Sequence, residues 1–355
     1  MAIGPSIWNK PKTKRFQDLL LAWYRRHRRR LPWRRNRTPY RVWVAEIMLQ
    51  QTRVQAAIPF YDRFLARFPT LESLAAASEA DVLELWAGLG YYQRARNLRK
   101  AAKQIVEEQG GKFPGSPEDI RRLPGVGRYT AGAIYSIAFD RPEPVVDGNV
   151  RRVICRTHGI AEAPEEFFWE QAEAWLAQKD PSDFNQAVME LGALICVPSR
   201  PLCGECPVET LCYTGRAGWV PPARGKLASA REAVEMVLLV LACEERVVLM
   251  RKPEAGFIPG EWGLPGRIVR DAESPRFCAG RLMRGILGEA LPFRECRPVR
   301  HAITRRDILA HVYCAEVDAP PPDFAPRSSC RWHSRGDLAR ILTSSLYRKA
   351  LRGYL

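Results

Sequence analysis

The chain has 355 residues, of which 46% are hydrophobic, so it is long enough for two domains that each bury a core. Its 55 lysines and arginines outnumber its 39 acidic residues, and the net charge of +16 favours a polyanionic partner such as a nucleic acid. The sequence contains no run of 18 or more apolar residues, which argues against a membrane-spanning helix and a membrane partner.

Residues 1–14 lack the apolar stretch of a secretory signal, so we expect a cytoplasmic protein associated with the nucleoid. Four of the ten cysteines cluster and the other six are scattered, a usage that suits a reducing compartment.

The first predicted element is an amphipathic helix over residues 14–27. The segment 25–41 then carries nine arginines and no acid. Such a run is usually a solvated surface. Here Trp33 and its apolar neighbours interrupt it, and arginines beside aromatic rings are typical of nucleic-acid contacts.

The next predicted helix covers residues 40–57, and it surrounds a single acid, Glu46, with apolar side chains. Burial disfavours the charged carboxylate and raises its pKa, so that Glu46 could hold a proton near neutral pH. A buried salt bridge to an arginine is an equally good interpretation of this pattern. Further helices are expected over residues 68–102, where the turn at 88–92 carries two tyrosines and is either a packed turn or a wedge beside a displaced base.

A helix that starts at the Ser116 cap should end at Pro124, and a second helix should run from Arg128 to Phe139. Gly125 and Gly127 lie between them, where they permit a tight turn with exposed amide groups. Two helices joined in this way can bind a phosphate without reading a base, although a plain helical turn has the same pattern.

Asp147 follows two prolines and precedes a predicted helix over residues 149–157. This position is typical of a helix cap, but near the glycine hairpin the same carboxylate could stabilise a positive sugar. Helices are also expected over 165–178 and 184–195, and no strand pattern precedes residue 230, so the first domain should be all-helical.

The spacing Cys196-x6-Cys203-x2-Cys206-x5-Cys212 places four thiols in one short loop. Four thiolates need a soft metal centre. One C-x-x-C flanked by single cysteines fits a 4Fe–4S cluster better than zinc, for which two separated C-x-x-C knuckles are usual, so zinc remains the alternative.

Three predicted strands, 234–243, 246–251 and 307–317, mark a second domain of mixed α and β structure. The predicted organisation is therefore a helical domain over residues 1–217, a basic linker over 218–232, and a smaller domain over 233–355.

The chain resembles the MutY-type adenine DNA glycosylases of the helix–hairpin–helix superfamily, over most of residues 14–317. The segments that carry the resemblance are A-E-I-M-L-Q-Q-T at 45–52, G-L-G-Y-Y at 88–92, L-P-G-V-G at 123–127, V-D-G-N at 146–149 and the cysteine loop. The resemblance implies an all-α helix–hairpin–helix glycosylase domain with a cluster loop, followed by an α+β Nudix-like domain. It also implies removal of adenine mispaired with 8-oxoguanine or guanine in double-stranded DNA, in base excision repair, by a monomer.

Residue roles follow from the same resemblance. Glu46 matches the acid that protonates the flipped adenine, Asp147 matches the carboxylate that stabilises the sugar cation, and Tyr129 and Asn149 match residues that hold this site. The adenine pocket corresponds to Arg29, Leu31, Trp33, Arg34, Val54 and Gln186. The DNA and lesion-strand contacts correspond to Gln51, Thr52, Leu89, Tyr91, Gly125, Gly127 and Thr304.

Tyr129 stands where endonuclease III-like enzymes carry a lysine, whose amine attacks the sugar and leads to strand cleavage. A phenol cannot form a Schiff base, so a monofunctional glycosylase is expected. The alternatives are a bifunctional glycosylase and lyase that acts on oxidised pyrimidines, and a non-catalytic iron–sulfur protein that binds DNA.

The C-terminal region resembles the Nudix-like domain with which this family senses 8-oxoguanine. Residues 279–290 lack the acids that bind magnesium in Nudix enzymes, so neither magnesium nor pyrophosphatase activity is expected. The family's Phe-Ser-His recognition loop aligns with Ile303-Thr304-Arg305, in which only the hydroxyl group is kept. We therefore expect weaker or altered sensing of the lesion.

Overall fold

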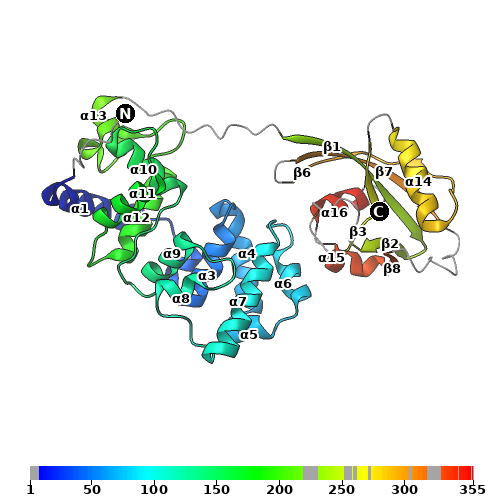
Figure 1. Cartoon of the computed structure of the whole chain (residues 1–355), viewed down its shortest axis with the longest axis horizontal. Helices are drawn as coiled ribbons and strands as arrows, with labels where there is room; N and C mark the ends of the chain where they lie inside the picture. Colours follow the sequence, from blue (N-terminus) through cyan, green and yellow to red (C-terminus); the bar gives the residue numbers. More distant parts are fainter. Residues whose placement is uncertain are drawn as a thin grey trace. The chain divides into compact units, whose positions relative to one another are not determined.

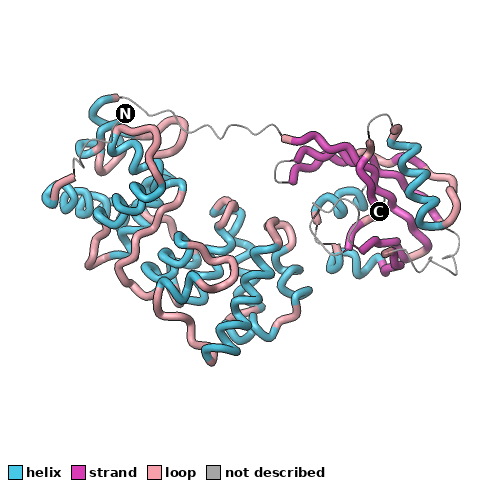
Figure 2. Tube along the Cα trace, in the orientation of Figure 1, coloured by secondary structure: helices cyan, strands magenta, loops and turns pink. Residues whose placement is uncertain are grey.

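The computed structural model describes residues 8–218, 231–251, 258, 262–270, 273–303, 306–317, 329–342, 344–352 and 354. The chain divides into two compact units, Met1–Ala77 with Gln93–Leu227 and Ser78–Tyr92 with Ala228–Leu355. Residues 78–92, which the sequence placed in the first domain, therefore group with the second unit. The first unit is helical and the second contains the sheet, so the predicted fold class of a helical unit and a smaller α+β unit is confirmed (Figures 1 and 2).

The part of the first unit that the structure describes contains helices and short 3₁₀ turns, and no strand precedes Glu232 in the described residues. Its elements are α1 (Lys10–His27), α2 (Pro32–Arg35), α3 (Pro39–Leu49), α4 (Val54–Arg67), α5 (Leu71–Ala76), α7 (Gln93–Gln109), α8 (Pro117–Arg121), α9 (Arg128–Ala138), α10 (Gly148–His158), α11 (Glu165–Trp175), α12 (Pro181–Leu194), η1 (Cys203–Glu205), η2 (Glu209–Leu211) and α13 (Tyr213–Ala217). Large side chains of α1, α11 and α12, including Phe16, Trp175 and Phe184, share one buried core.

The predicted single helix over residues 40–57 is wrong, because the chain forms two helices that are separated at residues 50–53. Gln51 adopts the left-handed conformation, with φ of 56°, which interrupts the helix. Arg94 of α7 donates hydrogen bonds to the carbonyls of Ile47 and Met48, each at 2.9 Å, and to that of Gln50. A guanidinium from a distant helix thus satisfies the carbonyls that the end of α3 leaves unpaired.

The predicted glycine hairpin joins α8 to α9. Ser116 caps α8 by accepting a hydrogen bond from the Asp119 amide at 3.2 Å. Gly125 has φ of +79°, and a Cβ atom there would lie 2.9 Å from Asn97 Nδ2, so the turn requires glycine for both conformation and space. Gly127 lies directly before α9 and caps it.

The second unit is built on a sheet with strand order β3-β2-β1-β7-β5, to which β4, β6 and β8 add by pairing with β1, β7 and β2. Its elements are α6 (Glu79–Trp86), β1 (Glu232–Cys243), β2 (Arg246–Arg251), β3 (Trp262–Gly263), β4 (Gly266–Ile268), α14 (Pro275–Leu287), β5 (Arg294–Glu295), β6 (Val299–Ile303), β7 (Arg306–Glu316), β8 (Cys330–Ser334), η3 (Arg335–Asp337), α15 (Leu338–Ile341) and α16 (Ser345–Arg352). Strands β1 and β7 pair in parallel, with Val234 opposite Ile308.

Strand β1 is buried on both faces of the sheet. Met236 and Leu238 belong to a core that also contains Leu346 of α16, whereas Val237 and Leu239 belong to a core with α14. Helices therefore cover both faces (Figure 1). This arrangement explains why the segment is a continuous apolar run and does not alternate with polar residues.

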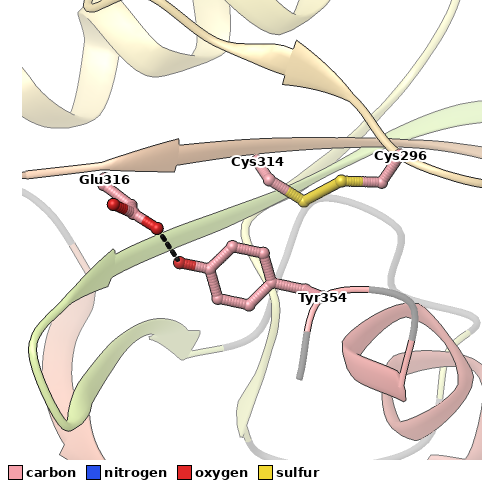
Figure 3. The surroundings of a disulfide bond; sticks show 4 residues. All are labelled: Cys296, Cys314, Glu316 and Tyr354. Atoms are coloured by element: carbon pink, nitrogen blue, oxygen red, sulfur yellow. Dashed lines mark hydrogen bonds between the residues drawn. A yellow bond between two sulfur atoms is a disulfide. The ribbon is translucent and has the colours of Figure 1, made fainter.

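Two of the six scattered cysteines, Cys296 and Cys314, are joined by a disulfide that links β7 to the residue after β5 (Figure 3). The Tyr354 hydroxyl lies beside this region and donates a hydrogen bond to Glu316 Oε1 at 3.2 Å. The spacing of these cysteines in the sequence did not predict the pair. Among the described residues, the helices are too short or too polar to cross a bilayer.

Candidate active site

The first unit contains a cavity of about 220 Å³. Its lining includes every residue that the sequence placed in the catalytic group or the base pocket: Glu46, Asp147, Tyr129, Asn149, Arg29, Leu31, Trp33, Arg34, Val54 and Gln186. These residues come from segments that are up to 157 positions apart in the sequence. The structure therefore brings the two proposed catalytic carboxyls to the wall of a single cavity.

Glu46 lies on α3 and its side chain is almost fully removed from solvent, with 6% exposure. Its hydrogen bond comes from the Tyr129 hydroxyl, 2.9 Å from Oε2. Burial raises the pKa of Glu46 to about 7, the Tyr129 hydrogen bond opposes this shift, and the nearby charge of Asp147 adds to it. The partner that the structure gives Glu46 is thus a phenol and not the arginine of the alternative interpretation. The Glu46 carboxyl group, with a pKa raised to about 7, therefore titrates near neutral pH.

Asp147 is both the cap of α10 and part of the cavity wall. Its Oδ1 accepts a hydrogen bond from the Val150 amide at 2.7 Å, and its Oδ2 accepts one from Asn149 Nδ2 at 2.8 Å. Burial raises the pKa of Asp147, while these hydrogen bonds favour the charged form and oppose the rise. The capping contact fixes the direction of the carboxylate in the cavity wall, and the role of Asp147 toward the sugar stays a prediction.

Asn149 is held in turn by Arg152, a residue that we did not predict as part of the site. Arg152 Nη2 donates to Asn149 Oδ1 at 2.8 Å and to the Gly192 carbonyl at 2.6 Å. Its Nε donates to the Cys196 carbonyl at 2.7 Å. One arginine therefore links the first turn of α10 to the end of α12 and to the first cysteine of the loop.

Polar side chains of α2 and α12 also line the cavity. Arg34 Nε donates to Gln186 Oε1 at 3.0 Å. Glu190, another residue that we did not predict, accepts hydrogen bonds from both Arg29 and Arg34. The signal for Glu190 was present in the sequence, since it is an acid among apolar residues of a helix, as Glu46 is.

The chain matches the family model described as HhH-GPD superfamily base excision DNA repair protein over residues 44–178. It is 35% identical to the adenine DNA glycosylase of Mus musculus, over 96% of this chain and 78% of the mouse protein. The adenine DNA glycosylase of Homo sapiens is 50% identical over 96% of this chain and 74% of its own length. The chain belongs to the adenine DNA glycosylase family.

Among solved structures, a thermostable thymine-DNA glycosylase matches 58% of this glycosylase and 98% of its own chain, with a TM-score of 0.55 and 30% identity. An endonuclease III bound to DNA covers 60% of this glycosylase and 99% of its own chain, with a TM-score of 0.53. At 21% identity, the second likeness shows a shared fold.

The predicted DNA-contacting residues of this glycosylase are placed less uniformly than the pocket residues. Thr52 lines the cavity, whereas Gln51 is exposed on the turn after α3. Leu89 and Tyr91 lie on the turn between α6 and α7, where Leu89 is buried with 8% exposure and Tyr91 is exposed at 43%. Gly125 and Gly127 form the hairpin, and Thr304 lies outside the described residues. A role for Leu89 at the DNA surface would therefore require its side chain to move.

The four clustered cysteines, Cys196, Cys203, Cys206 and Cys212, line one small pocket of about 20 Å³ together with Arg156. Arg156 Nη1 donates to Cys196 Sγ at 3.3 Å. Within the described residues, no three or more histidine, cysteine or acidic side chains have the geometry of a metal site. The four cysteines nevertheless line one pocket, and four thiolates are a donor set suited to a soft metal centre.

Proposed function

We propose that this DNA N-glycosylase hydrolyses the bond between adenine and deoxyribose, at adenines opposite 8-oxoguanine or guanine. The observation that carries the proposal is the pair of buried carboxyls, Glu46 and Asp147, in the wall of one cavity. The names of the adenine-specific relatives support the choice of base. Double-stranded DNA is the substrate, and we propose that the enzyme acts as a monomer.

Each carboxyl has a separate task. The adenine leaves the base stack and enters the cavity, because its glycosidic bond is inaccessible within the duplex. Protonated Glu46 transfers its proton to a ring nitrogen of the base, so the electron pair of the breaking C–N bond remains on a neutral leaving group. Ionised Asp147 stabilises the positive charge that develops on the sugar. Water then adds to the sugar carbon and releases a proton.

Strand cleavage should not accompany base release. Tyr129 has no amine with which to form a Schiff base, so the expected product is an intact strand that breaks only after alkali treatment. We would measure single-turnover release from duplexes with A:8-oxoguanine, A:G and thymine glycol, with and without alkali. Nicking of the first two duplexes without alkali, or release of thymine glycol in place of adenine, would contradict this function.

The glycine hairpin and the basic segment 25–41 bind the DNA backbone. The amides around Gly125 and Gly127, at the start of α9, can bind a backbone phosphate without reading the sequence. We also propose that the second unit senses the base opposite adenine. Its predicted recognition residue, Thr304, follows β6, and α14 contains no acid that could bind magnesium.

We propose that Cys196, Cys203, Cys206 and Cys212 hold a 4Fe–4S cluster that stabilises this part of the DNA-binding surface. Cys203→Ser should therefore lose iron and duplex affinity together, as measured by absorbance with chemical iron analysis and by fluorescence anisotropy. Cys155→Ser, at a cysteine of α10 outside the loop, should keep both. Normal affinity in a Cys203→Ser protein that lacks iron would show that the cluster has no part in DNA binding.

A further inference from the structure

Glu190 is one of the most deeply buried charged side chains of the first unit, with 1% exposure on α12. Its Oε1 accepts hydrogen bonds from the backbone amide and Nε of Arg29, each at 2.9 Å, and from Arg34 Nη1 at 3.2 Å. Its Oε2 accepts from Arg29 Nη2 at 2.8 Å and from Arg34 Nη2 at 2.9 Å. One carboxylate thus holds two guanidinium groups, each through a bidentate contact.

The hydrogen bonds from the two arginines favour the ionised form of the Glu190 carboxyl group. Burial raises the pKa of Glu190, but the hydrogen bonds from Arg29 and Arg34 outweigh burial and hold its pKa at about 2. Near neutral pH, one negative charge therefore lies between two positive charges.

The network extends from Arg34 to the amide of Gln186. Arg34 Nε can only donate, so its 3.0 Å contact requires the oxygen of the Gln186 amide to face it. The Gln186 nitrogen donates to the Ser182 carbonyl at 3.2 Å and to Ser182 Oγ at 3.3 Å. Arg34 therefore contacts the oxygen of the Gln186 amide and Ser182 contacts its nitrogen. Both sets of contacts require the same orientation of the amide.

We propose that Glu190 is a positioning residue for base recognition, which holds Arg29 and Arg34 in place and, through Arg34, fixes the orientation of Gln186 before a base enters the cavity. The inference rests on the proposed function, because Arg29, Arg34 and Gln186 line the cavity that would receive the adenine. Polar groups that are already oriented lose little conformational entropy when the base binds. Arg29, Arg34 and Gln186 would therefore favour the alignment of the base in which the reaction can occur.

Glu190 also balances the positive charges of Arg29 and Arg34, and Arg34 lies near the proposed catalytic acid Glu46. Glu46 faces Tyr129 of α9, Asp147 at the start of α10 and Arg34 of α2, and the positive charge of Arg34 lowers the pKa of Glu46. If the negative charge of Glu190 is removed, the charge of Arg34 and Arg29 is no longer balanced, and the pKa of Glu46 should fall further. A residue that served only to hold α12 in place would have no such effect.

The test uses the full chain with Glu190→Gln, which keeps the size of the side chain and removes its charge. Single-turnover release of adenine from an A:8-oxoguanine duplex should be roughly 100-fold slower at pH 7, because a small misplacement of positioning groups has effects of this size. The midpoint of the alkaline loss of activity should move to lower pH. Affinity for the duplex, measured by fluorescence anisotropy, should change little. Glu190 lines the cavity and is buried, so its side chain cannot contact the DNA phosphates.

Two further variants make the outcome decisive. Glu190→Asp keeps the charge on a shorter stem, so it should slow release while the pH midpoint stays near that of the wild type; this variant decides the question if Glu190→Gln does not fold. Asp183→Asn is the matched control, since Asp183 lies on α12 and pairs with Arg37 at 3.2 Å but does not line the cavity. It should release adenine at the wild-type rate.

The inference would be overturned if folded Glu190→Gln released adenine at the wild-type rate with the wild-type pH midpoint. If Glu190→Gln does not fold, a wild-type rate of adenine release in Glu190→Asp would overturn it. A loss of rate that only matches the loss of folded protein, seen in thermal unfolding, would also overturn it. The wild-type protein distinguishes the failure of the two proposals. If the wild type releases no adenine, the proposed function fails. If the wild type releases adenine and the Glu190 variants release it at the same rate, only the positioning role of Glu190 fails.

Discussion

Asp147→Asn should reduce single-turnover adenine release by at least about 10²- to 10³-fold, because the variant lacks the negative charge that opposes the developing sugar cation. The variant loses the acceptor for Asn149 Nδ2 but keeps the helix cap, so its stability should fall less than that of a variant without the cap. Asparagine caps helices about as well as aspartate does, and its side-chain oxygen can still accept the hydrogen bond from the Val150 amide. Release assays and thermal unfolding on the same preparation measure both quantities.

Asp147→Ala provides the matched comparison. It removes the charge and the cap together, so it should be inactive and also less stable by about 1 kcal/mol. If Asp147→Asn kept the wild-type rate while Asp147→Ala lost stability, Asp147 would be a helix cap without a chemical role.

Glu46→Gln should slow adenine release by about 10²- to 10⁴-fold, the range expected when a general acid is removed. The pH dependence gives a second signature. Since the pKa of Glu46 is raised to about 7, the wild-type acid is protonated below that pH, and the rate should fall as pH rises through it. The residual rate of Glu46→Gln should show no such decline. An alkaline decline that persisted in the variant would assign the titration to another group.

The same substitution should affect stability with a defined sign. Glu46 has its ordinary pKa of 4.5 in the unfolded chain and about 7 in the folded one. Its neutral form therefore contributes stability that is fully present below pH 4.5 and is lost as pH rises through 7, by up to about 3 kcal/mol. Glu46→Gln cannot ionise, so relative to the wild type it should be more stable at pH 8 than at pH 4, as measured by thermal unfolding at both pH values.

The sequence by itself determined much of the secondary structure of this glycosylase. The hairpin between α8 and α9, the cap at Ser116 and the strands β1, β2 and β7 were predicted within a few residues. Their signals are local, because caps, glycine turns and apolar runs act over a few neighbouring positions. Local signals also marked Glu46 and Asp147 as unusual acids, although they left the alternatives of a salt bridge and a helix cap open.

Only the tertiary structure decided the contacts of these two acids and which distant residues line one cavity. The end of α3 depends on Arg94, more than 40 positions later in the chain, and the partner of Glu46 is Tyr129. The disulfide between Cys296 and Cys314 and the contacts of Glu190 to Arg29 and Arg34 are likewise long-range. Partners of this kind are selected by the packing of distant segments, and the identity of a residue and its immediate neighbours do not specify which distant group will reach it.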